Sequence, residues 1–279
     1  MAERDPGRRG RRPSVLKVSL PSALALGVAA AMSLLAFCWP LLWTPRSGPG
    51  SDMAGGQTPL VFALVLPVVI AVVMTQLGHD DMDVKALALL GVLTAVGAGL
   101  RPLGTGTAGM ELIFFLMILA ARVFGPGFGF VLGTTTLFCS ALLTSGMGPW
   151  LPFQMLAAGF VGLGAGLLPR LRGRAEVAML GLYGVLSGFV YGWLMDLAFW
   201  PFALGNASAL SFDPTIGPWA NLHRFVLYNA ATSMGWNLGR ALTNLVLILV
   251  LGPSVLRILR RASRRANFDQ ACRPMRNLP

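Results

Sequence analysis

The composition of this 279-residue chain is typical of an integral membrane protein. Hydrophobic residues make up 55% of it and charged residues only 12%, whereas a soluble globular domain carries about 25% charged residues. The net charge is +11, from 22 basic and 11 acidic residues. The basic residues are concentrated in the two tails beside apolar segments, which indicates membrane orientation rather than binding to nucleic acid.

Both tails are expected to be cytoplasmic. Residues 1–17 form one basic tail and residues 259–279 the other, and Lys and Arg beside a span mark the cytoplasmic side. Two cytoplasmic ends require an even number of spans. The tails also suit contact with anionic lipid headgroups. We therefore expect a multi-pass protein of the bacterial inner membrane.

The apolar segments predict eight transmembrane helices and an all-α fold. A span needs about 20 apolar residues. In chain order the predicted helices cover residues 18–43, 59–77, 84–100, 109–124, 128–145, 151–168, 177–200 and 225–251. Segment 18–83 is predicted to be a plain apolar hairpin. Residues 84–258 are predicted to form a six-helix core that carries the function. The spans of this core contain glycine, threonine, aromatic residues and isolated charges.

The chain lacks the sequence patterns of metal binding, ATP hydrolysis and nucleophilic catalysis. Cys38, Cys139 and Cys272 have neither metal-ligand nor disulfide spacing. His79 and His223 lie far apart, and no glycine-rich turn has the Walker spacing. We therefore expect no metal, no cofactor and no catalytic residue. Any energy source must be a partner protein or an ion gradient.

Small residues on the third predicted helix are candidates for a docking surface. Gly91, Ala95 and Gly99 recur at four-residue spacing, so they share one face and allow another helix to approach closely. They serve either a partner membrane protein or ordinary packing within this chain.

The last predicted helix carries a polar stripe that is unusual for a span. Its members fall within about 100° of arc and are Asn229, Ser233, Trp236, Asn237, Arg240 and Asn244. A charged residue in a span needs a partner. For Arg240 the candidates are Asp196, Glu111 or an anionic group of a ligand. All three charged residues are expected near the outer side, where they form a binding pocket or merely lock the helices together.

Aromatic and amide side chains are expected at the same outer level. Candidates for ligand contact among them are Trp150, Gln154, Tyr191 and Trp193. The same aromatic residues would also suit an interfacial belt. Loop 201–224 is long enough to act as a lid over the site.

Three runs of residues give the core a recognisable order. The first contains 92–95 (VLTA) and 99–102 (GLRP), the second is 124–129 (FGPGFG), and the third contains 148–155 (GPWLPFQM) and 162–169 (GLGAGLLP). In this order, across 84–258, they resemble the substrate-binding subunits, or S components, of energy-coupling-factor vitamin importers. The first two predicted helices are not covered by the resemblance.

The resemblance implies a mechanism. The subunit would bind a vitamin at its outer face and deliver it through a transmembrane coupling subunit that two ATPase subunits drive. Gly91, Ala95 and Gly99 would contact the coupling subunit, and loops 101–108, 146–150 and 201–224 would form the gate. The tryptophan-rich outer ends favour a large ligand, cobalamin or a related corrinoid, although riboflavin or another small vitamin stays open.

Two other function classes remain. A membrane enzyme acting on a lipid or isoprenoid would use Arg240, Asp196 and Glu111 as headgroup ligands, but it would normally need a metal or acid–base cluster. A structural membrane subunit without a ligand is the third class.

Overall fold

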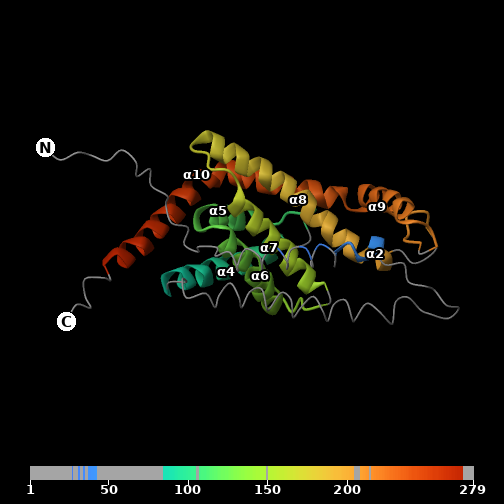
Figure 1. The fold of residues 1–279 in the computed structure, drawn as a ribbon, viewed down its shortest axis with the longest axis horizontal. Coiled ribbons are helices and arrows are strands. Elements are labelled where there is room, and N and C mark those ends of the chain that lie inside the picture. Colours follow the sequence, from blue (N-terminus) through green and yellow to red (C-terminus); the bar gives the residue numbers. More distant parts are fainter. Residues whose placement is uncertain are drawn as a thin grey trace.

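The structure, a computed structural model, describes residues 84–104, 107–148, 150–203, 208–213 and 215–272, and in the N-terminal region residues 37–42 with three isolated positions before them. Within these residues every regular element is helical, which confirms the all-α prediction (Figure 1). The predicted helices at 18–43 and 59–77 lie almost wholly outside the described residues.

The described helices follow the chain as a bundle with one long arm. Figure 1 shows α8 and α10 running side by side along the bundle, and α9 at its far end close to α2. Their bounds are α2 Trp39–Leu42, α4 Val84–Gly104, α5 Phe114–Phe124, α6 Pro126–Leu143, α7 Leu151–Leu167, α8 Arg174–Ala203, α9 Pro218–Thr232 and α10 Met234–Cys272.

Four of these helices are long and apolar enough to cross a membrane: Lys85–Gly104, Pro126–Leu143, Arg174–Pro201 and Met234–Arg264. The apolar helices α5 and α7 are shorter. The bundle therefore fits a multi-pass membrane protein but not the predicted count of spans. With 11 residues, α5 is only about 16 Å long, about half the apolar thickness of a bilayer.

Two predicted helices have different bounds in the structure. The helix expected from Gly109 begins at Phe114, because Ala108 and Gly109 have positive φ angles of 42° and 81°, which a right-handed helix cannot include. The helix expected at 225–251 is two helices, α9 and α10, which meet at Ser233. The Ser233 backbone N–H caps α9 at Asn229 O.

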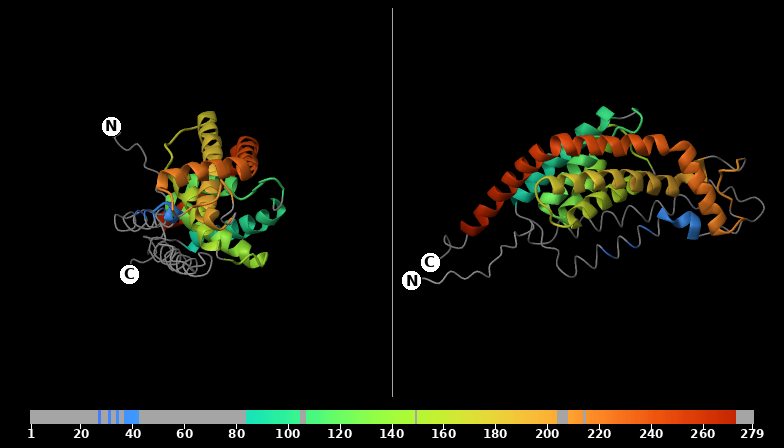
Figure 2. Two further views of the ribbon diagram at one scale, coloured as in Figure 1. Left: turned by 90° about the vertical axis from the view of Figure 1, so that its right-hand side faces the viewer. Right: turned by 90° about the horizontal axis from the view of Figure 1, so that it is seen from above.

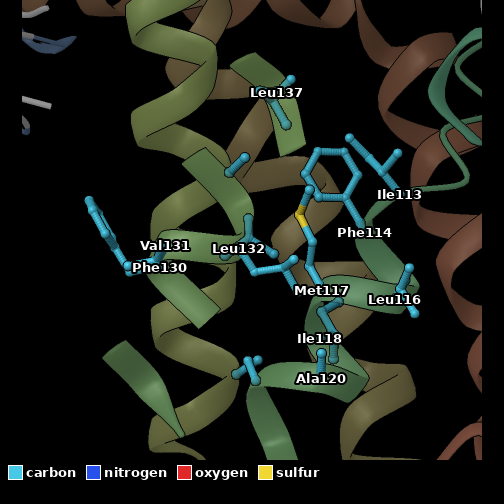
Figure 3. Packing of buried hydrophobic residues seen from close by; sticks show 14 of the residues in the cluster. Ile113, Phe114, Leu116, Met117, Ile118, Ala120, Phe130, Val131, Leu132 and Leu137 are labelled. Carbon is cyan, nitrogen blue, oxygen red and sulfur yellow. The ribbon is translucent and has the colours of Figure 1, made fainter. Parts of the chain in front are cut away.

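Helix α5 forms the centre of the bundle. Nine of its 11 residues are buried, and it contacts α6, α7, α8 and α10. Figure 3 shows Phe114 and Met117 of α5 near Leu132 and Leu137 of α6. These buried apolar side chains fill the interior of the bundle and support the fold.

Glycines allow α6 and α7 to pack backbone against backbone. A Cβ atom added to Gly162 would lie 2.0 Å from Gly129 O, and one added to Gly133 would lie 2.4 Å from Ala158 O. Such short distances leave no room for a side chain. The glycine-rich runs quoted above therefore have a direct structural role.

One end of the bundle is strongly basic. Glu176 on α8 is buried there and pairs with Arg122 of α5 (Nε to Oε1, 2.8 Å) and Arg260 of α10 (Nη2 to Oε2, 2.6 Å). We define the basic end by these three residues and the exposed arginines 170, 172, 174, 257, 261 and 264. Figure 2 shows α10 extending beyond the bundle at this end.

Candidate functional site

Arg240 on α10 is the centre of a buried polar network. Its Nη2 donates to Glu111 Oε1 at 2.9 Å, and its Nη1 donates to Gly188 O and Asn237 Oδ1, each at 3.1 Å. The guanidinium carbon lies 4.9 Å from the centroid of the Tyr191 ring, a cation–π distance. The structure therefore pairs Arg240 with Glu111, one of the candidates from the sequence.

Glu111 reaches Arg240 from a segment that is not helical. Residues 107–113, between α4 and α5, pack tightly on α10. A Cβ added to Gly109 would lie 2.2 Å from Trp236 O, and one added to Gly239 would lie 1.9 Å from Ala108 O. The absence of both side chains lets the segment lie on the helix and holds Glu111 beside Arg240.

Asp196 on α8 belongs to a second branch of the network. Asn229 Nδ2 donates to Asp196 Oδ2, and Ser233 also hydrogen-bonds to this carboxyl group. Asn237 Nδ2 lies 3.5 Å from Asn229 Oδ1, which joins this branch to Arg240. The two carboxylates therefore have different partners: Glu111 pairs with the cation, and Asp196 with amide and hydroxyl groups.

Asn244 lies one turn further along α10 and is fully buried. Its Nδ2 donates to Gly184 O at 3.0 Å. Its Oδ1 has no partner among the described residues. Asn244 therefore connects α10 to α8, and its Oδ1 extends the polar face of α10 by one turn beyond Arg240.

Glycines of α8 make the close approach of α10 possible, and the sequence analysis missed them. Cβ atoms added to Gly184, Gly188 and Gly192 would lie 2.8, 3.1 and 1.8 Å from atoms of Ile248, Ala241 and Asn237, respectively. These glycines recur every four residues, the same spacing that singled out Gly91 and Gly99. This spacing is visible in the sequence, and it identifies the face of α8 against which the polar stripe of α10 packs.

Gln154 on α7 takes part in a contact beside the network. Arg101 Nη2, near the end of α4, donates to Gln154 Oε1 at 3.0 Å. Arg101 was not among the predicted site residues. It adds a second arginine that links α4 to α7.

Three predicted tryptophans do not join the network. Trp150, Trp193 and Trp236 are all exposed, and only the backbone of Trp236 contacts the Glu111 segment. Their side chains lie on the outside of the bundle, where aromatic residues of a membrane protein contact lipid or the interface. Among the tryptophans whose side chains the structure describes, Trp200 is the buried one.

Part of the predicted lid is ordered by its own contacts. Trp200 packs edge to face against Phe212 and Phe225, and its Nε1 donates to Leu210 O at 2.7 Å. Asp213 accepts from the backbone and hydroxyl of Thr215, which lowers the pKa of the Asp213 carboxyl group. Residues 208–213 are thus held over the end of α8, next to the start of α9.

Gly91, Ala95 and Gly99 lie on the exposed face of α4. A Cβ added at Gly91 or Gly99 would meet no atom of the described residues within 4 Å. The opposite face packs on α6, where Thr94 Oγ1 lies 3.0 Å from Thr135 Oγ1. The three small residues are therefore not used for packing among the described residues.

The network and the basic end lie at opposite ends of the bundle. Arg240 precedes Arg257 by 17 residues on the same helix, a separation of about 25 Å along the axis. Among the described residues, no group of three His, Cys, Asp or Glu side chains could hold a metal ion. No protein-family model, curated protein or solved structure matches this chain.

Proposed function

We propose that this chain is the membrane-embedded substrate-binding subunit of an energy-coupling-factor vitamin importer, and that its ligand binds at the Arg240 network. The observation that carries the proposal is the place of this network in the fold. It lies where non-helical backbone meets the bundle, at the segment 107–113 that connects α4 to α5 and at the break at Ser233 between α9 and α10.

Interrupted helices are a feature of transport proteins. Non-helical backbone at membrane depth is tolerated where protein or a water-filled cavity surrounds it, and discontinuous helices form the substrate sites of many transporters. Intramembrane ionisable residues are also expected at substrate pathways. Glu111 and Asp196 each contact such an interruption, which a purely structural ion pair would not need.

The exposed small-residue face of α4 supports the second part of the proposal. Among the described residues, a Cβ added at Gly91 or Gly99 meets no atom within 4 Å, and Ala95 is exposed on the same face. A coupling subunit could bring its own helix close to this face because no side chain stands in the way. The two ATPase subunits would supply the energy that this chain has no motif to obtain.

The orientation that import requires follows from charge. With the basic end in the cytoplasm, the Arg240 network and the ordered part of loop 201–224 lie toward the outside. Cobalamin or a related corrinoid remains the ligand that we favour from the sequence resemblance, and Tyr191, which packs on Arg240, is an aromatic residue in contact with the network.

Ligand binding is tested on the purified protein with a panel of vitamins that includes cobalamin and riboflavin. We expect at least one compound to raise the thermal unfolding temperature of the wild-type protein, and Arg240→Gln to abolish the shift. Arg257→Gln, an exposed arginine on the same helix, is the control and should keep it. If no compound stabilises the folded protein, the proposed function is wrong.

A further inference from the structure

We propose that Arg240 anchors an anionic group of the transported ligand, a carboxylate or a phosphate, and that Glu111 occupies this position until the ligand displaces it. The inference rests on the proposed function and specifies the chemistry of the same site. It follows from the way in which the donors of Arg240 are distributed between its partners.

One edge of the Arg240 guanidinium is only half used. In arginine, Nε and Nη2 carry parallel N–H groups on the same edge, and a carboxylate or phosphate binds such an edge through two oxygens. Here Nη2 donates to one oxygen of Glu111. Nε is buried and has no partner among the described residues. Glu111 therefore neutralises the charge of Arg240 but leaves one of its buried hydrogen-bond donors unsatisfied.

The other contacts of Arg240 do not depend on Glu111. Nη1 is held by Gly188 O and Asn237 Oδ1, and the guanidinium lies on the Tyr191 ring. These groups come from α8 and α10, which pack closely through their glycines. The guanidinium therefore keeps its orientation when Glu111 leaves, with the Nε–Nη2 edge available.

Glu111 is the more accessible member of the pair. Its side chain is 28% exposed, against 9% for that of Arg240. It belongs to the non-helical segment 107–113, whereas Arg240 is fixed within a helix. An exchange of partners would therefore move the segment that carries Glu111 and leave α10 in place.

The charge of the ligand group follows from the charges that remain near Arg240 after Glu111 has been displaced. Asp196 is held by hydrogen bonds from Asn229 and Ser233 and, among the described residues, makes no ion pair with Arg240 that could replace the one with Glu111. A neutral ligand would leave Arg240 as an uncompensated buried charge, which is strongly unfavourable. An anion restores the pair and can also satisfy Nε.

The test compares acids with their neutral counterparts. For each compound that stabilises the protein, binding is measured by calorimetry for the acid and for its primary amide, or for the phosphate and its dephosphorylated form. We expect the anion to bind at least about 10-fold more tightly, as a charge-assisted hydrogen bond implies. Glu111→Gln removes the competing carboxylate, so it should tighten anion binding several-fold and leave binding of the neutral form unchanged.

The outcomes separate the two proposals. Equal affinity of acid and amide, or weaker anion binding by Glu111→Gln, would overturn the anionic anchor while the importer function survives. Absence of binding by every compound would overturn both. Arg240→Gln should remove the preference for the anion. If that variant does not fold, the measurements on Glu111→Gln decide, with Arg257→Gln as the matched control on the exposed face of α10.

Discussion

Glu176 shows how a single residue can hold one end of this bundle. Its carboxylate is almost completely buried and accepts hydrogen bonds from Arg122 and Arg260. Arg122 also donates to Leu168 O, just after α7. Four helices, α5, α7, α8 and α10, therefore meet through one acid and two bases.

The first prediction ranks three arginine substitutions at this end. Arg122→Gln should destabilise most, by about 3–5 kcal/mol, because it leaves a buried charge partly uncompensated. Arg260→Gln should cost about 1 kcal/mol, since the Arg260 side chain is 35% exposed and solvent weakens such pairs. Thermal unfolding in detergent measures both.

Arg261→Gln is the control for this ranking. Arg261 is exposed next to Arg260 and makes no ion pair among the described residues, so its loss should leave the unfolding temperature unchanged. A decrease as large as that for Arg122→Gln would mean that net charge, and not the contacts of Glu176, determines stability.

At the residue scale the sequence predicted which polar side chains of the last helices are buried better than how they pair. The helical periodicity placed Asn229, Asn237, Arg240 and Asn244 on one face, and all four are buried. It could not decide between Glu111 and Asp196, because that choice depends on the loop at 107–113. The role of Glu176 was not predicted either, because its partners Arg122 and Arg260 lie 54 and 84 positions away in the sequence and only the tertiary fold brings them together.

At the element scale, glycines determine which helices can touch. The second prediction is that Gly162→Ala prevents α6 and α7 from packing, because the new Cβ would lie 2.0 Å from the backbone oxygen of Gly129, and backbone cannot move aside as a side chain can. We expect loss of monodisperse protein in size-exclusion chromatography. Gly91→Ala, with no atom within 4 Å of the new Cβ, should be tolerated.

The third prediction separates docking from packing on α4. Gly91→Leu and Ala95→Leu should abolish co-purification with a coupling subunit and leave ligand binding and thermal stability unchanged, because both positions are exposed. If ligand binding or stability falls together with co-purification, the face serves the fold of this chain and not a partner.

The fourth prediction concerns the ordered segment 208–213. Trp200→Phe keeps the aromatic packing but removes the donor to Leu210 O, so hydrogen exchange in this segment should become faster while that in α5 is unchanged. Equal exchange in both proteins would mean that the hydrogen bond does not hold the segment.

Hydrogen exchange in segment 208–213 should depend on pH only below the usual titration range of a carboxyl group. The pKa of Asp213 is lowered below its usual value of 3.8 by the Thr215 contacts. A carboxyl group with a lowered folded-state pKa contributes stability above its unfolded pKa and loses it as the pH falls through the folded value. Exchange in 208–213, corrected for intrinsic rates, should therefore stay constant between about pH 8 and 5.

At the scale of the molecule, composition predicted the helical class correctly, while among the described residues four of the six predicted spans there have helices long enough to cross a membrane. A run such as 109–124 is apolar except at Glu111 and Arg122, so it predicts one long helix. In the structure this helix begins only at Phe114, because positive φ angles at Ala108 and Gly109 let the preceding segment leave the helical path and lie on α10. Hydropathy carries no information about such a tertiary contact, and the same holds for the break at Ser233.

The last prediction tests which end of the molecule faces outward, since import requires the Arg240 network there. In a variant whose native cysteines are replaced, a single cysteine at Ala209, exposed in the ordered loop, should react with a membrane-impermeant maleimide in intact cells. A single cysteine at Arg172, exposed at the basic end, should react only after the membrane is permeabilised. The reverse pattern would place the network on the cytoplasmic side. Uptake from outside would then need a second site, and the Arg240 network would have to serve release rather than capture.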